Sequence, residues 1–485
     1  MLVSYIQKSL KNSLVYGLST IIGRGINFLF LPFFLSNLSL REIGLWDFYQ
    51  MWQSLGSILI SSCATVSMLR FILLYKDDPT RHKYVIGNAF LLMLGGIGIL
   101  LISWLILFLC NSPYAPDIYG SLTAINLSGV ALFSLVITYF RSKEFLGFYL
   151  GIFLIQNFIV ISCTVWGVYH GYGILSFFYA NLLSLIPALL SFFFIFSRHL
   201  RFSKILLKEQ LSYSFPIIVS SVLFTLFFSI DRLFLRHYAG LEMLGWYSLL
   251  WRFGAIFQIL SVTIADTWPI VLFSAQKEKN PDQLISQLII YFCLALLSGY
   301  LIALLGARLA IAYFLSPMYH TLIDSLPLFF LPIVVVSLSQ LFNAGFGLAK
   351  KTWLMPFLAL GTFCLQALLL WIGAQEIERI FIINTLAFGS YAIFNYYCGS
   401  YFYGKSLSNT NFLYRIFLLF SLYVISLHYL FTQHAPWYLS FLVVASWPPA
   451  LWMLGIIKKE VEWMYAHFYS YIMSRIMYQK KEHNL

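Results

Sequence analysis

Long apolar segments, each about as long as a membrane-spanning helix, recur along the whole chain and are separated by short polar breaks. A helix that crosses the hydrocarbon core of a bilayer needs about 20 largely apolar residues. By that measure the pattern predicts fourteen spans, at 12–36, 44–66, 85–110, 118–140, 145–168, 172–197, 211–236, 242–266, 284–306, 324–348, 352–374, 379–402, 411–431 and 437–457. The segments 44–66 and 324–348 hold more polar residues than the rest, and no polar stretch is long enough for a soluble domain.

The positions of Lys and Arg give an independent test of this count, because cytoplasmic loops of membrane proteins are enriched in both. With the N-terminus in the cytoplasm, the predicted inner segments hold 23 basic residues. The predicted outer segments hold only Arg41, Arg236, Arg308 and Arg379. Three more lie within spans: Arg24, Arg232 and Arg252. One missed or invented span would reverse the alternation from that point on, so the pattern predicts that both termini are cytoplasmic.

Composition supports the same class of protein. The chain has 485 residues, of which 60% are hydrophobic and 10% charged, against about 25% charged residues in soluble domains. The net charge of +12 is explained by basic cytoplasmic loops, and no nucleic-acid partner is expected. The six cysteines are scattered through apolar segments without metal-ligand spacing, so we expect neither a metal nor another cofactor.

Two parts of the chain are similar to each other. Residues 13–17 resemble 212–216, and residues 41–46 resemble 242–247 with Gly44 opposite Gly245. Together with a basic linker at 197–210, this predicts an all-α polytopic membrane protein with two six-helix lobes in parallel pseudo-two-fold repeat around a central cavity. The predicted parts are an N-terminal lobe (1–200), a C-terminal lobe (201–405), two additional helices (406–457) and a cytoplasmic interfacial tail (458–485).

Several short motifs place this chain near a known group of membrane proteins. They are Leu38-Ser39-Leu40-Arg41-Glu42-Ile43-Gly44, Ser214-Phe215-Pro216, Asp231-Arg232-Leu233 and Gly245-Trp246-Tyr247, with a looser match at Trp268-Pro269. In these motifs, in length and in span count, the chain resembles the polysaccharide-transport or O-antigen flippase family (Wzx type) of the MATE-like MOP exporter superfamily.

The resemblance implies a flippase and not an enzyme. It would move oligosaccharide repeat units of O-antigen or another surface polysaccharide, carried on undecaprenyl pyrophosphate, from the inner to the outer leaflet of a bacterial cytoplasmic (inner) membrane by alternating access. The implied partners are this lipid-linked oligosaccharide, membrane lipids, a polysaccharide polymerase and a chain-length regulator.

A pyrophosphate substrate needs fixed cations in the cavity. Arg24 and Arg252 are predicted to lie deep in spans of opposite lobes, and the planar guanidinium pairs well with two phosphate oxygens. We expect both to bind the anionic headgroup. The alternative is that each pairs with a carboxylate and locks helices together.

Four further charges are candidates for gating or ion coupling. Asp231 and Arg232 are adjacent, so their side chains point about 100° apart on a helix and do not neutralise each other. We expect Asp231 to pair with an arginine of another helix and Arg232 to reach the lipid headgroups, or else Asp231 to gate the outward-facing state. Asp47 and Asp266 lie near opposite ends of their spans, and either one is a candidate to carry a coupling proton. The alternative for both is a simple role at the membrane rim or as a helix cap. Asp47 also lies at a depth that would allow a salt bridge to Arg24.

Polar uncharged residues inside spans are candidates for contacts with sugars. The best-grouped pairs are Gln156 with Asn157 and Gln340 with Asn343. The alternative is that these side chains bond between helices and only stabilise packing.

Two other classes of protein compete with the flippase. A MATE-like cation-coupled exporter of small molecules would need a deep carboxylate and a less cationic cavity, whereas the deep charges here are mainly Arg. A membrane oligosaccharide polymerase or glycosyltransferase would need catalytic groups in a large outer loop. The longest outer loop, 306–323, holds a single charged residue, Arg308. No nucleotide-binding motif is present, so we expect transport to depend on a gradient of H⁺ or Na⁺.

Overall fold

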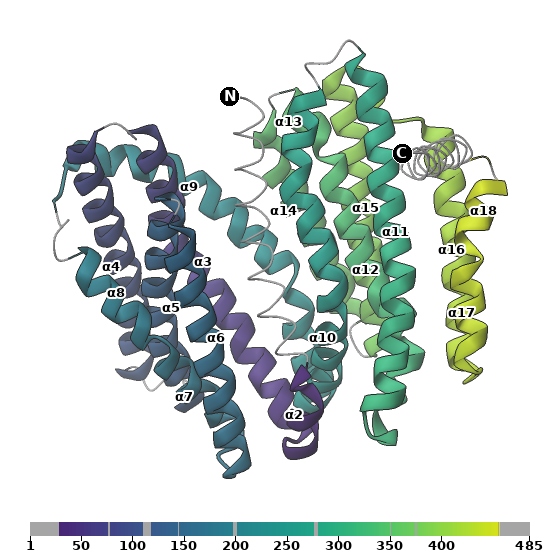
Figure 1. Cartoon of the computed structure of the whole chain (residues 1–485), viewed down its shortest axis with the longest axis horizontal. Helices are drawn as coiled ribbons and strands as arrows, with labels where there is room; N and C mark the ends of the chain where they lie inside the picture. The colour runs from purple at the N-terminus through teal and green to yellow at the C-terminus, as the bar shows by residue number, and fades with distance from the viewer. Residues whose placement is uncertain are drawn as a thin grey trace, which may run out of the picture. The chain divides into compact units, whose positions relative to one another are not determined.

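The computed structural model describes residues 29–75, 78–109, 118–143, 145–196, 201–275, 280–349, 351–373, 376–453 and 455. Within these residues every regular element is an α-helix or a short 3-10 helix (Figure 1). The all-α class predicted from the sequence is therefore confirmed.

Seven helices make up the first part of the described chain. They are α2 (Leu31–Asn37), α3 (Leu40–Leu74), α4 (Pro79–Leu109), α5 (Ile118–Ser142), α6 (Leu146–Tyr169), α7 (Leu175–Ser184) and α8 (Ile186–Phe196). A capping box begins α3: the Ser39 hydroxyl accepts from the Glu42 N–H, and the Glu42 carboxylate accepts from the Ser39 N–H. Pro187 has no N–H to donate, which accounts for the break between α7 and α8 at Leu185.

The remaining helices follow from residue 204 onward. They are α9 (Lys204–Phe227), α10 (Ile230–Ala275), α11 (Pro281–Phe314), η1 (Pro317–Tyr319), α12 (Leu322–Phe342), α13 (Ala344–Leu348), η2 (Thr352–Leu354), α14 (Met355–Gly373), α15 (Ile377–Tyr403), α16 (Thr410–Thr432), α17 (Trp437–Ala445) and α18 (Trp447–Met453). Gly240 interrupts α10 with φ +82°, a backbone conformation that glycine adopts without strain. The loop expected between the predicted spans 211–236 and 242–266 is thus a single-residue break in a helix.

The predicted linker at 197–210 is shorter than expected. Ser203 caps α9, because its hydroxyl accepts from the Leu206 N–H, and residues 204–210 are already helical. Asn88 of α4 holds this start of α9 through two bonds to the Ser203 backbone, of 3.0 and 3.1 Å. The second half of the expected linker is therefore part of a membrane helix.

Eleven helical segments of the described chain are long and apolar enough to cross a membrane, which makes this a multi-pass membrane protein. One of them, Lys204–Ala255, covers two of the fourteen predicted spans. The predicted span 437–457 is divided between α17 and α18. Most of 12–36 and all of the predicted tail 458–485 lie outside the described residues. The count of fourteen stays a prediction.

Internal contacts divide the chain into two compact units. The first contains Met1–Ile259 and Thr352–Tyr391, and the second contains Leu260–Lys351 and Ala392–Leu485. These bounds differ from the lobes expected from the internal repeat, 1–200 and 201–405, which remain a prediction.

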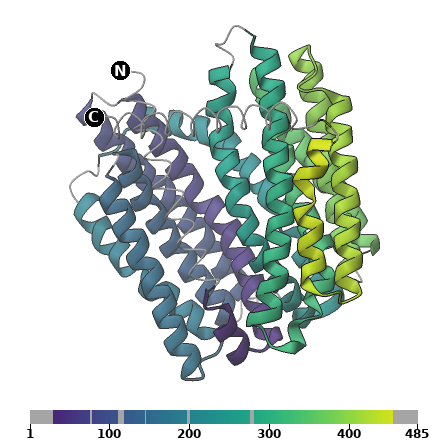
Figure 2. The same cartoon turned by 45° about the vertical axis from the view of Figure 1, so that its right-hand side comes forward.

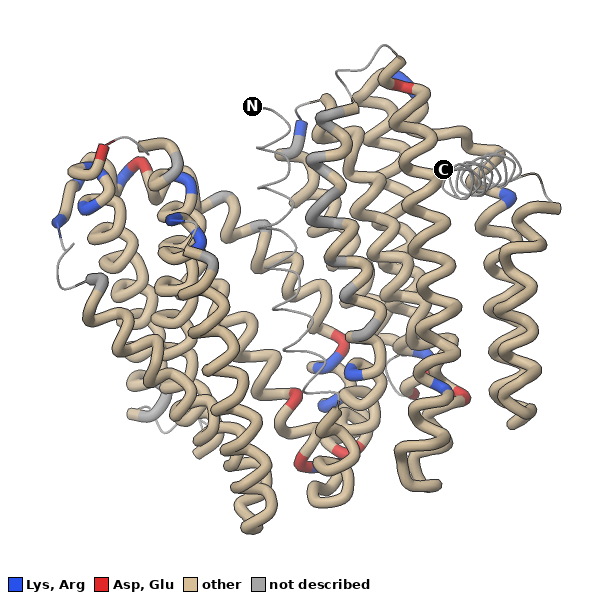
Figure 3. The backbone as a smooth tube through the Cα atoms, in the orientation of Figure 1, with Lys and Arg blue, Asp and Glu red and all other residues tan. Residues whose placement is uncertain are grey.

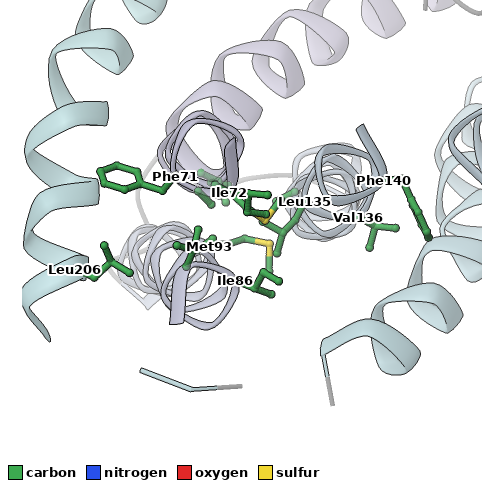
Figure 4. Close-up of a cluster of buried hydrophobic side chains, with 14 of the residues drawn as sticks. Phe71, Ile72, Ile86, Met93, Leu135, Val136, Phe140 and Leu206 are labelled. Carbon is green, nitrogen blue, oxygen red and sulfur yellow. The ribbon is translucent and has the colours of Figure 1, made fainter. Parts of the chain in front are cut away.

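The first unit has an apolar core where α3, α4 and α5 meet. Figure 4 shows residues of this core, including Ile72, Ile86, Met93, Leu135 and Val136, packed between the helices. Small residues at the helix crossings, Ala64, Ala89 and Ala131, are fully buried. Such residues let helix backbones approach closely, which is a main source of helix association in membranes.

The second unit is built around α11, α12 and α16. The Tyr300 hydroxyl of α11 donates to the Pro327 carbonyl of α12 at 2.8 Å, and its ring meets Phe420 of α16 edge to face. α17 packs against both α11 and α16 (Figures 1 and 2). Arg308, predicted to lie in an outer segment, is buried here and donates to the Ser440 hydroxyl and the Ala435 carbonyl.

Lys and Arg residues of the first unit gather at one end of the helix bundle, where α3 ends and α4 begins (Figure 3). Arg70 and Arg141 lie in the last turns of α3 and α5, and Arg81 and Lys204 lie in the first turns of α4 and α9. This is the distribution that the fourteen-span topology assigns to the cytoplasmic side.

Candidate functional site

A cavity of about 740 Å³ lies inside the first unit, among α2, α3, α5, α6, α7 and α10. This volume is within the range typical of ligand pockets, roughly 300–1,000 Å³. Its charged lining residues are Asp47, Arg232 and Arg252. Six carboxamide side chains also line it: Gln50, Gln53, Gln156, Asn157, Asn181 and Gln258. The cavity is therefore polar, although it lies among membrane-spanning helices.

A three-layer stack of side chains holds one of these charges in place. The Arg252 guanidinium lies over the Trp46 ring, 4.0 Å from its centroid, and Trp46 stacks on Phe177 with ring centroids 3.8 Å apart. A guanidinium over an aromatic face is attracted by the negative charge density of the ring. The stack links α10, α3 and α7 and fixes the orientation of Arg252.

Arg252 has no carboxylate partner within the described part of the chain. Its Nε is buried and makes no hydrogen bond there. A partly buried cation without an ion pair carries a desolvation cost, which Asp47 offsets only beyond ion-pair distance and which a bound anion would offset further. Arg252 is therefore joined to α3 through an aromatic ring and not through the carboxylate considered for a helix lock.

Arg232 is in the opposite situation. Its Nε donates to the Asp47 carboxylate at 2.8 Å and one terminal nitrogen donates to the Phe228 carbonyl at 3.0 Å. Both side chains of this ion pair are nearly buried, with 14% and 12% exposed. The expectation that Arg232 reaches the lipid headgroups is wrong, because Asp47 holds it inside the bundle. Asp47 is paired with Arg232, so the expected bridge from Asp47 to Arg24 is not needed to neutralise it.

Asp231 points away from its neighbour into a separate polar cluster. Its carboxylate accepts from the Tyr247 hydroxyl, from the Asn384 amide at 2.8 Å and from the Arg232 N–H at 2.8 Å. Gln366 in turn donates to the Asn384 carbonyl oxygen at 2.8 Å. The expectation that Asp231 pairs with an arginine of another helix is wrong, since Tyr247 and Asn384 take that place.

α3 and α10 touch at a pair of glycines close to both polar regions. A Cβ added at Gly44 would meet the backbone of Leu241 and Gly245, and one added at Gly245 would meet the Leu40 backbone. Only glycine allows two helices to approach this closely. The crossing places Asp47, three residues after Gly44, within reach of Arg232.

The other predicted site residues are distributed as follows. Gln156 and Asn157 line the cavity. Gln340 and Asn343 belong to α12 and its end in the second unit and do not line this cavity. Arg24 lies outside the described residues, as does the side chain of Asp266. Within the described chain, no three His, Cys, Asp or Glu side chains converge as a metal site requires.

Several lining residues were not predicted, although their spacing in α3 carries a readable signal. Trp46, Gln50, Gln53 and Ser57 all line the cavity. They recur every three or four residues, which places them on one face of a helix. Part of the polar character of the segment 44–66 is thus a stripe in its first half that faces the cavity. Asn181 and Thr164 gave no such signal.

Solved structures with a similar fold are those of membrane transport proteins. The lipid II flippase MurJ in an inward closed conformation matches with a TM-score of 0.67 and 13% sequence identity, over 92% of this chain and all of that chain. A multidrug resistance MATE family transporter in an outward-facing conformation gives 0.58 and 15%, over 81% of this chain and 96% of that one. A MOP superfamily transporter from Pyrococcus furiosus, described as having a binding pocket of reverse polarity, gives 0.56 and 16% over the same shares.

These matches assign the chain the fold of these MATE transporters and of MurJ. A comparison with curated protein sequences finds no significant match. The sequence profile of one family, described as polysaccharide biosynthesis protein, matches residues 9–273. That is more than half of the chain, and the protein belongs to this family.

Proposed function

We propose that this protein is a flippase for oligosaccharide repeat units linked to undecaprenyl pyrophosphate, which it moves from the inner to the outer leaflet of a bacterial cytoplasmic membrane. Family membership and the MOP fold support transport in polysaccharide biosynthesis. The substrate has an anionic pyrophosphate, polar sugars and a lipid tail. A polar cavity among membrane helices suits the first two, while the tail can stay in the bilayer.

Arg252 is the observation that carries this proposal. Its guanidinium lies over Trp46 with a buried Nε, forms no ion pair among the described residues, and lines the cavity. Bidentate pairing with phosphate oxygens is the characteristic interaction of such a group. We propose that Arg252 binds the pyrophosphate, with Arg24 as a second contact.

A MATE-like exporter of organic cations is supported less well by this cavity. Among its described lining residues Asp47 is the one carboxylate, and Arg232 already neutralises it. A cationic substrate would therefore meet an excess of positive charge.

For the energy source we propose a gradient of H⁺ or Na⁺, with Asp231 as the better candidate among the described carboxylates. Its side-chain partners, Tyr247 and Asn384, are neutral donors that can reorient when the Asp231 carboxylate binds a proton or an ion. Asp47 would have to give up its ion pair with Arg232 to take up either. In this scheme the Asp47–Arg232 pair is part of the gate that closes the cavity on the side where α3 begins.

The topology proposed with this function places both termini in the cytoplasm. A polysaccharide polymerase and a chain-length regulator would receive the repeat units on the opposite side of the membrane.

The test is deletion of the gene in a bacterium that carries it and no paralogue. We expect lipid-linked repeat units to accumulate in the inner leaflet and surface polysaccharide to fall, with recovery when the wild-type gene is restored. Purified protein in proteoliposomes should also move an undecaprenyl-pyrophosphate-linked oligosaccharide between leaflets. Unchanged surface polysaccharide in the deletion strain would refute the proposal.

A further inference from the structure

One wall of the cavity, formed by α6 and α7, presents side-chain oxygens that have no partner in the described chain. Asn157 lies on α6, and Asn181 lies on α7. The Asn157 amide nitrogen donates to the Phe153 carbonyl at 2.8 Å, and that of Asn181 donates to the Phe177 carbonyl at 2.7 Å. Because a carbonyl oxygen can only accept, each amide must turn its nitrogen toward its own helix. The two Oδ1 atoms remain as free acceptors.

Thr164 adds a buried hydroxyl to the same wall. Its side chain is 1% exposed, and its Oγ1 has no hydrogen-bond partner among the described residues although it lines the cavity. Thr164 follows Asn157 by seven residues, so both lie on one face of α6, roughly 10 Å apart along the helix axis. Buried hydroxyls in proteins almost always have a partner. Here a ligand can supply it.

The side of the cavity that α10 forms carries its positive charge. Arg232 and Arg252 on α10 have only N–H groups to offer. The stack of Arg252, Trp46 and Phe177 runs from α10 to α7, and Asn181 is bonded to the carbonyl of Phe177 at the α7 end of this stack. The positive charge of the cavity therefore lies along α10, whereas the free amide oxygens of Asn157 and Asn181 lie on α6 and α7.

We propose that the α6–α7 wall is a sugar subsite, and that it selects uncharged sugars, which donate hydrogen bonds through hydroxyl or acetamido N–H groups, over sugars that carry a carboxylate. This inference rests on the proposed function and names the sugar class that sits beside the pyrophosphate. A hydroxyl or N–H can satisfy the free oxygens of Asn157 and Asn181. A carboxylate placed there would face these two oxygens, and its only donors on this wall would be neutral ones, the Thr164 hydroxyl and the Gln156 amide.

Binding to the full-length protein in lipid nanodiscs would test this inference. Four probes are needed: undecaprenyl pyrophosphate alone, the same lipid linked to a neutral disaccharide, the same lipid linked to a disaccharide with one uronic acid, and the free neutral disaccharide. We expect the neutral sugar to raise affinity over the bare lipid and the uronic acid to raise it less. Affinity for the neutral lipid-linked probe should fall by about 3- to 10-fold, the value of one hydrogen bond, in each of the variants Asn157→Leu, Asn181→Leu and Thr164→Val. Affinity for the bare lipid should not change.

Asn37→Leu is the matched control. The Asn37 amide nitrogen makes the same bond to the carbonyl four residues earlier, at 2.8 Å to Phe33, but Asn37 does not line the cavity. This variant should bind all probes as wild type does, so an effect confined to the other three variants cannot come from the loss of that helix bond.

The outcomes separate this inference from the proposed function. The sugar subsite would be overturned if the uronic acid probe bound as tightly as the neutral lipid-linked probe, or more tightly. It would also be overturned if the Asn variants lost as much affinity for the bare lipid as for the neutral lipid-linked probe. If the free disaccharide bound in an Asn157- and Asn181-dependent way while none of the lipid probes bound, the subsite would stand and the lipid-linked substrate would be wrong. Failure of all four probes would overturn both.

Discussion

Two polar regions of the first unit lie close together along α10, and they differ in how their polar groups are satisfied. Around Asp231, the carboxylate, Tyr247, Asn384 and Gln366 are joined in one chain of hydrogen bonds. In this first region the carboxylate and its donors satisfy one another and only the Gln366 Oε1 is left without a partner, whereas the Arg252 Nε and the Thr164 hydroxyl of the second region, the cavity, have no protein partner among the described residues. The difference distinguishes a structural polar cluster from a binding site in a membrane, where unpaired polar groups are costly.

Arg232 stands at the boundary between these regions. Its backbone N–H bonds Asp231, while its side chain bonds Asp47 in the cavity wall. Two adjacent residues thus serve two regions, because successive side chains on a helix point in different directions.

The largest expected effect comes from removing Arg252, the cation of the cavity that has no ion pair among the described residues. Arg252→Ala should lower binding and transport of the pyrophosphate-linked substrate by about 10- to 100-fold, the value of charge-assisted hydrogen bonds, without lowering the melting temperature. Arg252→Lys should recover part of the loss, because it keeps the charge without the planar fork. Complementation of the deletion strain and binding to purified protein measure both.

Arg236→Ala is the control for that experiment. The Arg236 guanidinium also lies over an aromatic ring, 3.7 Å from the Phe48 centroid, but Arg236 does not line the cavity. Normal transport by Arg252→Ala at a normal protein level would remove the basis for calling the cavity a binding site.

Substitutions in the hydrogen-bonded cluster around Asp231 should lower the stability of the protein more than its ligand binding. Asp231→Leu leaves the Tyr247 hydroxyl and the Asn384 amide without their acceptor, and we expect a loss of about 2–4 kcal/mol in unfolding free energy. Asp231→Asn keeps an acceptor oxygen and should cost less, while any dependence of transport on an ion gradient should weaken. Thermal unfolding in detergent compares the two. Wild-type stability of Asp231→Leu would contradict the description of this cluster as structural.

The glycine crossing holds both regions in place, so a methyl group there should disturb both. Gly245→Ala forces a Cβ against the Leu40 backbone, and we expect a destabilisation of about 1–3 kcal/mol together with weaker ligand binding. Gly361→Ala in α14 is the matched control, because a Cβ there meets nothing within 4 Å and alanine favours a helix. If Gly245→Ala matched Gly361→Ala in melting temperature, the close approach of α3 and α10 would be unimportant.

The smallest expected effect is a gain. Asp47→Asn removes the carboxylate that neutralises Arg232 and so leaves a second uncompensated cation in the cavity. We expect anion binding to tighten by about 3- to 10-fold at low salt, and this gain to shrink as ionic strength rises. Titration with inorganic pyrophosphate at several salt concentrations measures it. Unchanged binding at low salt would mean that Arg232 does not face the ligand.

Much of the fold and part of the site could be predicted from the sequence, because apolar length and the positions of charges are properties of the chain itself. Span length in a bilayer follows from the number of apolar residues, and buried charges in such spans are rare enough to mark function. Arg252 was identified in this way, and the structure places it in the cavity wall. The motifs that carried the family resemblance also have local physical roles. Ser39 and Glu42 form the cap of α3, and Tyr247 bonds Asp231.

The tertiary structure decided which partner each polar group meets. Nothing in the sequence distinguishes an Arg232 bonded to Asp47 from one that reaches the headgroups, since both fit the same depth in the membrane. Asn181 and Asn384 were equally plausible as packing residues, and only their surroundings make one an open acceptor and the other a donor to Asp231. The aligned Gly44 and Gly245 indicated a repeat, but their contact became visible only when α3 crossed α10. Spans follow from local composition, whereas a cavity and its polarity depend on helix rotation and packing, which bring together residues far apart in the chain.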